Sequence, residues 1–285
     1  MLEGAIAGKE YSEINFPRSR IGTFDVGVLG RKKHHVLTLL ELDVTDARKE
    51  IRKQRQRERI SFTGWMLKTI ADTLMSHKEM CAYLKGKTKK VVFDDISITL
   101  AVEKSVNGNL VPLPLLLEKV QLKTPAQITA LIEDAHRLCI EGEDQAVIGK
   151  KTSRWAMKLY YFLPGFLRLR IMSAIINNPR KAKKTMGNVM FTSLAGLGKA
   201  AGWIIPKSYH NLCFALGSVV KKPWVVKDQI VIREIAHLTI LINHDVVDGA
   251  PMARFVSDLS RRMERGEKEP KDHFGSITDT GHREQ

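Results

Sequence analysis

Long apolar runs and cysteine are scarce in this 285-residue sequence. No window of about 18–20 apolar residues occurs, so we expect no helix that crosses a bilayer. The 3 cysteines are too few for a disulfide framework and show no metal-ligand spacing, which favours a reducing compartment and no bound metal. The N-terminus lacks a basic flank followed by an apolar core, so we predict no signal peptide and a cytoplasmic location.

Acidic residues are missing from one long stretch. No Asp or Glu lies between Asp144 and Asp228, where 15 Lys and Arg occur. The rest of the chain carries equal numbers of the two signs, so the net charge of +15 belongs to one region on a neutral body. This distribution argues against a protein coated in nucleic acid along its whole surface.

The composition is that of a globular protein, with 44% hydrophobic and 27% charged residues. Hydrophobic periodicity predicts an α/β fold, and no long linker or repeat divides the chain. We expect one domain over residues 1–266, a basic aromatic insertion at about 141–186, and a polar, disordered tail at 267–285. Strands are expected at 36–45, 187–194, 212–220, 229–233 and 237–243, a hairpin at 88–112, and helices at 46–58, 61–84, 124–140 and 250–266.

One motif carries recognisable chemistry. A strand rich in β-branched residues ends at His244, and Asp248-Gly249 follows just before a predicted helix. A histidine at the end of a rigid strand can be aimed, and its neutral ring can accept a proton near neutral pH. The alternative is that Asp248 only caps the helix while His244 is an exposed surface residue.

Four further segments, taken with this motif, extend the pattern along the chain. They are the segments that begin at Arg18 (RSRIG), His35 (HVLTLLELDVT), Ile98 (ITLAVEKSVNGNLVP) and Gly187 (GNVMFTSLAG). In this order they resemble the catalytic domain of the dihydrolipoamide acyltransferases of 2-oxoacid dehydrogenase complexes, and more distantly chloramphenicol acetyltransferase. The motif at His244–Gly249 matches the terminal H-x-x-x-D-G of that family.

The resemblance implies roles for individual residues. His244 would be the general base, and Thr192 would donate a hydrogen bond to the oxyanion of the tetrahedral intermediate, with Ser193 as the alternative donor. Asp248 would pair with Arg18 rather than transfer a proton. Asn243 and Asp245 flank His244 where the family has other residues, so its ion pairs must differ here. The remaining candidates are Gly249 in the motif and the residues expected to line the coenzyme channel: Ser105, Asn107, Gly108 and Leu110.

The resemblance also implies an architecture. We expect a chloramphenicol acetyltransferase-like mixed sheet flanked by helices, assembled as a homotrimer with active sites at subunit interfaces. The sequence does not decide whether such trimers assemble further into a cage. Acyl-CoA would be a substrate, and no cofactor would be bound permanently. The chain has no room for a lipoyl domain, so a lipoyl group could reach the site only from another protein.

The insertion at 141–186 mixes aromatic and basic residues. Such a mixture suits an interfacial element on an anionic membrane, around 154–184. It equally suits a lid whose cations face the phosphates of CoA, or a segment that merely packs on the body. Nucleic-acid binding has only the charge in its favour.

These observations lead to a functional hypothesis: a CoA-dependent acyltransferase that acts on a thiol or hydroxyl, with a lipid-like or membrane-associated acceptor. One alternative is a dihydrolipoamide acyltransferase that works with a separately encoded lipoyl protein. The other is a trimeric scaffold without catalytic activity.

Overall fold

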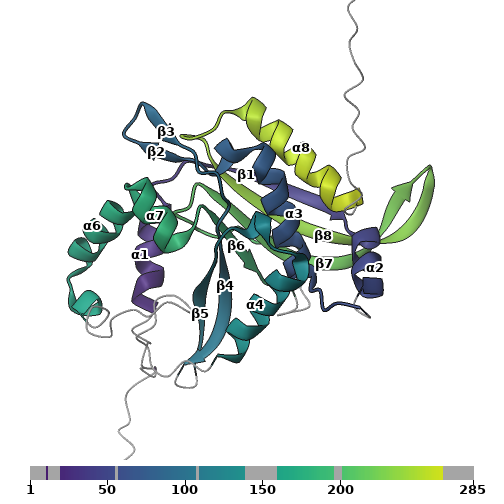
Figure 1. Cartoon of the computed structure of the whole chain (residues 1–285), viewed down its shortest axis with the longest axis horizontal. Helices are drawn as coiled ribbons and strands as arrows, with labels where there is room; N and C mark the ends of the chain where they lie inside the picture. Colours follow the sequence, from purple (N-terminus) through teal and green to yellow (C-terminus); the bar gives the residue numbers. More distant parts are fainter. Residues whose placement is uncertain are drawn as a thin grey trace, which may run out of the picture.

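The computed structural model describes residues 11, 20–54, 57–106, 109–138, 159–195 and 201–265. A six-stranded mixed sheet in the order β1-β8-β7-β6-β4-β5 forms the centre of the molecule, and β2 and β3 form a separate hairpin (Figure 1). The strands are β1 (His35–Asp43), β2 (Tyr83–Lys85), β3 (Lys89–Val91), β4 (Ile98–Val106), β5 (Asn109–Leu117), β6 (Val189–Ser193), β7 (Leu212–Val226) and β8 (Gln229–Asn243). A mixed sheet flanked by helices was predicted from the sequence, and the structure confirms it.

Helices cover one face of this sheet and gather at one side of it. Figure 1 shows α3, α4 and α8 over the face, with α1, α6 and α7 together at the side. Their bounds are α1 (Ile21–Gly30), α2 (Thr45–Gln54), α3 (Phe62–Ser76), α4 (Pro125–Arg137), α6 (Gly165–Ile176), α7 (Pro179–Met186) and α8 (Gly249–Arg265), with short 3₁₀ turns η2 (Lys78–Cys81) and η3 (Val120–Leu122).

The core lies between the sheet and helices α3 and α8. Both helices place apolar residues three or four positions apart, which gives each a continuous apolar stripe. The sequence predicted a helix at 250–266, and in α8 the stripe is Met252, Phe255, Leu259 and Met263, all of them buried. It packs with α3 and with the buried residues of β7 and β8, so the C-terminal helix is anchored directly behind the end of β8.

Local capping signals set two helix starts where the sequence placed them. The hydroxyl of Ser61 accepts a hydrogen bond from the backbone N–H of Gly64, and Thr124 and Gln127 form a reciprocal capping box before Pro125. The predicted helix at 61–84 was too long, because the backbone leaves the helical conformation at His77 and continues into η2 and β2.

The C-terminal strands are longer than predicted. The strands expected at 229–233 and 237–243 are one continuous strand, and β7 extends to Val226 to pair with it. Lys227 and Asp228 both have positive φ, which suits the tight turn of a twisted hairpin. In the outer half of this hairpin the sequence predicted a strand only at 229–233, whereas the structure shows a fully paired arm that projects beyond the sheet (Figure 1).

Candidate functional site

The end of β8 presents His244 to solvent. This residue follows the last strand residue, Asn243, and is exposed, whereas Asn243 is only 1% exposed. The Asn243 side chain donates to the Asn211 side chain over 3.1 Å, and its carbonyl accepts from the N–H of Val246. The hydrogen bonds of buried Asn243 therefore hold the turn that carries His244.

A second anchor comes from the first strand. Because β1 is antiparallel to β8, His35 pairs with Asn243, and the residue before it lies beside the turn. The backbone N–H of His244 donates to the carbonyl of His34 over 2.9 Å, and the His34 ring pairs with the Asp245 carboxylate at 2.9 Å. These contacts hold the backbone of His244 from both sides while its side chain stays accessible.

Burial disfavours the charged forms of three groups beneath this turn. Burial lowers the pKa of Lys33, whose ammonium donates to Asn211 over 3.0 Å. Burial likewise lowers the pKa of His35, and it lowers that of His210 to about 4. His210 is hydrogen-bonded to the Met186 carbonyl at 2.9 Å and is 3% exposed, so it is a structural histidine rather than a proton carrier.

Asp248 and Gly249 begin the last helix. Both are exposed, and the Asp248 carbonyl accepts from the backbone N–H of Met252. The backbone therefore begins a helix at this point, as the sequence predicted. Arg18, the predicted partner of Asp248, lies outside the described residues, so that pairing stays a prediction.

The predicted oxyanion donors lie elsewhere on the sheet. Thr192 in β6 pairs with Ala215 of β7, which pairs with Thr239 of β8. His244 is five positions beyond Thr239, so roughly 16 Å along the strand and about 10 Å across it separate the two side chains. Ser193 lies one position further from His244, and its hydroxyl accepts from the N–H of Ala195. A single chain does not bring His244 and either hydroxyl together.

The predicted channel residues lie toward the end of the sheet opposite His244. Ser105 pairs with Leu110 at the outer end of the β4–β5 hairpin, on the Thr192 side. Asn107 and Gly108 lie outside the described residues. The site residues thus form two groups, with His244, Asp248, Gly249 and Asn243 at one end of the sheet and the hydroxyl donors and hairpin residues toward the other.

Sequence reasoning missed the support around His244. Lys33, His34 and Asn211 are far from the motif in sequence and meet it only because β1 and β7 flank β8. The adjacent histidines at 34–35, directly before a predicted strand, were the available signal.

Comparisons with known proteins find an acyltransferase catalytic domain. A model of the 2-oxoacid dehydrogenases acyltransferase catalytic domain matches residues 173–269. The dihydrolipoyllysine-residue acetyltransferase component of the pyruvate dehydrogenase complex of Corynebacterium glutamicum is 22% identical over 212 residues, which cover 72% of this chain and 25% of that protein. The chain therefore spans about a quarter of the length of this curated relative.

Solved structures show the same fold over nearly the whole chain. The cubic core of a pyruvate dehydrogenase complex matches with a TM-score of 0.64 and 15% identity, over 93% of this chain and 95% of that one. The dihydrolipoamide acetyltransferase of Azotobacter vinelandii matches with a TM-score of 0.64 and 16% identity over the same shares, and a probable dihydrolipoamide acetyltransferase from Listeria monocytogenes with 0.62 and 16%, over 93% and 99%. This chain resembles the 2-oxoacid dehydrogenase acyltransferase catalytic domain and has its fold.

The part that matches the acyltransferase family model carries most of the candidate chemistry. Residues 173–269 include β6 with Thr192, the β7–β8 hairpin, His244 and α8. The resemblance predicted from the motifs is confirmed.

In the described part of the segment predicted as an insertion, Tyr160 and Arg168 contact Asp25 of α1. The Arg168 guanidinium donates to the Asp25 carboxylate at 2.9 and 3.3 Å, and the Tyr160 hydroxyl donates to the same group at 2.9 Å. The hydrogen bond to Asp25 raises the pKa of Arg168. Phe162 and Phe166 of this acyltransferase-like chain do not pack inward and are 83% and 73% exposed.

The described part of the chain shows neither a cluster of metal ligands nor a helix that could span a membrane. Across those residues, no group of three or more His, Cys, Asp or Glu side chains is placed to hold a metal ion. None of the described helices is both long enough and apolar enough to span a membrane.

Proposed function

We propose that this chain is a CoA-dependent acyltransferase in which His244 is the general base. The observation that carries the proposal is an exposed imidazole on a turn that is held by buried hydrogen bonds at the end of β8. A base in this position removes the proton from a thiol or hydroxyl acceptor, which attacks the carbonyl of the acyl-CoA thioester directly and forms a tetrahedral oxyanion. Collapse of this intermediate breaks the C–S bond, and the departing CoA thiolate takes the proton back from the imidazolium. General-base catalysis of this kind contributes about 100- to 10,000-fold to the rate.

Thr192 would then stabilise the oxyanion that forms on the thioester carbonyl, with Ser193 as the alternative. Such a donor is worth about 3–4 kcal/mol, because the charge appears only in the transition state. Within one chain, Thr192 is too far from His244 to contact the same substrate. We therefore propose a homotrimer in which His244 of one copy faces Thr192 of the next, so that each active site lies between two copies.

The spacing of the candidate residues supports this assignment. The Azotobacter vinelandii structure concerns the roles of a serine, a histidine and an asparagine in catalysis. Thr192 and His244 have the same separation in sequence as that serine and histidine, and Asp248 follows His244 at the spacing of the asparagine. Asp248 is proposed to position the turn, with Arg18 as its partner. Because the similar pyruvate dehydrogenase structure is a cubic core, we also propose that the trimers can assemble into a larger cage.

The acceptor defines two versions of this proposal. In the first, dihydrolipoamide is carried in trans by a separate lipoyl protein, in line with the acetyltransferases that share the fold. In the second, the acceptor is lipid-like and the chain rests on an anionic membrane surface as a cytoplasmic, peripheral protein. The observation that favours the second is the pair of exposed rings, Phe162 and Phe166, in a stretch without acidic residues.

Vesicle sedimentation tests the membrane version. We expect the full chain to bind vesicles that contain phosphatidylserine, and the double variant Phe162→Ser/Phe166→Ser to lose that binding. The matched control is Leu122→Ser, which removes a 73% exposed apolar side chain from η3, outside the insertion. Equal binding by all three proteins, or none by the wild type, would remove the membrane acceptor from consideration.

Thiol release from a panel of short- to long-chain acyl-CoA thioesters tests the function itself. Dihydrolipoamide and a lipid extract serve as acceptors, and wild type and His244→Ala are compared. We expect acceptor-dependent release that falls at least about 100-fold in the variant. A folded trimer that releases no thiol with any acceptor would instead indicate a scaffold without catalytic activity.

A further inference from the structure

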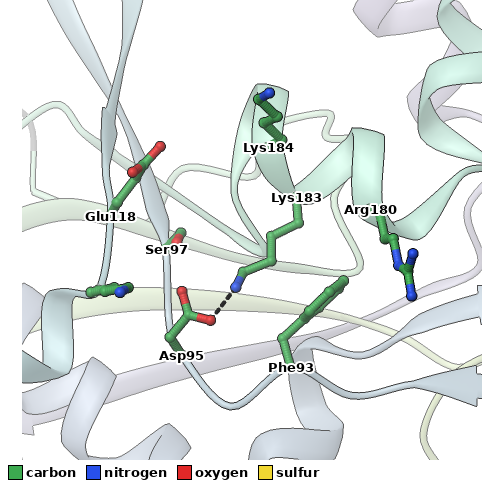
Figure 2. Close-up of a pocket in the computed structure, with 8 residues that line it drawn as sticks. Phe93, Asp95, Ser97, Glu118, Arg180, Lys183 and Lys184 are labelled. Carbon is green, nitrogen blue, oxygen red and sulfur yellow. Dashed lines mark hydrogen bonds and ion pairs between the residues drawn. The ribbon is translucent and has the colours of Figure 1, made fainter.

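The pocket that Figure 2 shows contains charged side chains that contact one another. Lys183 forms an ion pair with Asp95 and lies over the Phe93 ring, 4.6 Å from its centre. Among the described residues that line this pocket, none is a histidine or a cysteine. Those residues therefore do not offer the nucleophile and histidine base that are commonly paired in covalent catalysis. A pairing of that kind does occur on β7 and β8.

A bulge in β7 turns Ser218 toward the face of the sheet that carries His237. The register of the two strands shifts at this point, so Gly217 and Ser218 both lie opposite His237. Ala236 and Leu238, on either side of His237, belong to the core, so the imidazole points to the opposite face of the sheet. In an unbroken register Ser218 would pair with Ala236 and face the core. The extra residue of the bulge instead places its hydroxyl beside the imidazole, and bulges often redirect side chains next to active sites.

Ser218, His237 and Glu41 form a connected chain of hydrogen-bonding groups. The Ser218 hydroxyl lies 2.8 Å from His237 Nδ1, and His237 Nε2 lies 3.3 Å from a carboxylate oxygen of Glu41, which pairs with His237 across β1 and β8. A hydrogen bond from Lys222 lowers the pKa of Glu41, so this group is a carboxylate at neutral pH and can only accept. The Nε2 atom of the neutral ring therefore carries the hydrogen, and the Ser218 hydroxyl donates to the free Nδ1.

The carboxylate distinguishes this chain of groups from a second buried pair of serine and histidine. The Ser208 hydroxyl lies 3.3 Å from His210 Nδ1, but the Nε2 atom of that ring faces the Met186 carbonyl. A carbonyl carries no full negative charge to stabilise an imidazolium, and burial lowers the pKa of His210 to about 4. A nucleophile, a base and an acid that orients the base therefore occur together at Ser218 and not at Ser208.

An irregular segment, residues 201–208, covers the cluster and is called the strap. The N–H of Gly202 donates to the Ser218 hydroxyl over 3.0 Å, and the Gly202 carbonyl is a more distant neighbour of that hydroxyl at 3.4 Å. A Cβ atom on Gly217 would lie 2.1 Å from the Gly202 carbonyl oxygen, so the strap can lie this close to β7 only over a glycine. The Trp203 ring meets the His237 ring edge-on, with 4.5 Å between their centres. Ser218 keeps 8% exposure, so the hydroxyl lies just under the surface beside this ring.

Apolar side chains lie at the surface near the cluster. Leu39 lies two positions before Glu41, so it shares the same face of β1, and it is 48% exposed. Trp203 and Ile205 of the strap are 38% and 53% exposed. This surface suits an uncharged ester with an apolar acyl chain better than a charged substrate.

We propose that Ser218 is the nucleophile of a second site that hydrolyses uncharged esters, with His237 as its general base and Glu41 as the residue that positions the ring. Ser218 Oγ attacks the carbonyl carbon of the ester as its proton passes to His237 Nδ1. The tetrahedral intermediate collapses with cleavage of the C–O bond, and the departing alkoxide takes that proton, which leaves an acyl-serine. The site uses neither CoA nor His244, so it goes beyond the proposed function.

Water completes the reaction by the same route. A water molecule gives a proton to His237 Nδ1 and attacks the acyl-serine, and the departing Ser218 oxygen takes the proton back. The ester and water thus become a carboxylic acid and an alcohol, and the enzyme returns to its starting state.

Labelling of the full chain with an alkyl fluorophosphonate tests the nucleophile, because this reagent reacts with serines that a base has activated. We expect an adduct at Ser218 by peptide mass mapping, no adduct at this position in Ser218→Ala, and labelling that is at least about 100-fold slower in His237→Gln. Ser218→Ala removes a single oxygen, so the test does not depend on whether the larger change at His237 is tolerated. The matched control is Ser208→Ala, which should be labelled at Ser218 like the wild type.

Hydrolysis of p-nitrophenyl butyrate in the absence of CoA tests turnover. We expect the rate to fall at least about 100-fold in Ser218→Ala. Glu41→Gln should lower kcat and leave KM nearly unchanged, because a residue that positions the base acts on the chemical step, whereas a purely structural role would not give this split.

The variant Trp203→Ala removes the ring that covers the cluster. If neither this variant nor the wild type forms an adduct at Ser218, or if wild type and Ser218→Ala hydrolyse the ester equally fast, the site is overturned. Acyl transfer from acyl-CoA is measured separately. Transfer that depends on His244 without an adduct at Ser218 would refute this site alone, and an adduct at Ser218 without acyl transfer would refute the proposed function alone.

Discussion

Mixed assemblies of two inactive variants can decide whether the active site lies between copies. His244→Ala and Thr192→Ala are expected to lose about 100- to 10,000-fold and about 100- to 1,000-fold of the activity, respectively. Since the register of β6, β7 and β8 places the two side chains roughly 19 Å apart in one chain, the proposed site takes them from different copies. A randomly assembled equal mixture then contains about a quarter of sites with both groups intact.

The assay co-expresses the two variants, purifies the mixed assembly and measures thiol release from acyl-CoA. We expect about a quarter of the wild-type rate, far above either variant alone. The control mixes wild type with the double variant His244→Ala/Thr192→Ala. In this control, an active site between copies again predicts about a quarter of the wild-type rate, whereas a site within one chain predicts about half. A site within one chain also predicts that the mixture of the two single variants stays inactive. Activity of that mixture at the level of the single variants would refute the reasoning.

Three further predictions concern stability. The pKa of His210 is about 4 in the folded protein, below its ordinary 6.5. The free energy of unfolding should therefore fall by about 1.4 kcal/mol per pH unit as the pH drops from 6.5 to about 4. Urea unfolding of His210→Gln should show a smaller fall over the same pH range. Phe255→Ala opens a cavity in the core and should cost about 3–5 kcal/mol in urea unfolding. Asp25→Asn leaves Arg168 without its charge partner, so amide hydrogen exchange in α6 should speed up about tenfold or more.

The core and ion-pair predictions each have a matched control. Phe166→Ala removes an exposed ring and should change the unfolding free energy by less than about 0.5 kcal/mol. Arg170→Ala, on the same helix as Arg168, should leave exchange in α6 unchanged. An unaltered pH profile in His210→Gln would show that this buried ring does not resist protonation, and equal exchange rates in the Asp25 and Arg170 variants would show that the ion pair does not hold α6.

Local signals predicted much of the fold. The alternation of apolar residues predicted β1, β6 and a hairpin at 88–112, and the pattern near the C-terminus predicted α8. The bounds of that hairpin were wrong, because residues 89–91 pair with β2 and the β4–β5 hairpin spans residues 98–117. In the outer half of the β7–β8 arm the local pattern predicted only the strand at 229–233, because charged residues interrupt the apolar pattern in the rest of that half. Pairing between the two strands, rather than burial, keeps that half extended.

The sequence by itself determined the fold class, the resemblance to an acyltransferase catalytic domain and the placement of His244 at a strand end, because each depends on residues that are neighbours in the chain. Only the tertiary structure decided how the candidate residues group. It set His244 and Thr192 at different positions on the sheet, and it placed His34 and Asn211 beside the turn that carries His244. Strand order and register, which join residues far apart in sequence, fix those distances, and no local pattern encodes them.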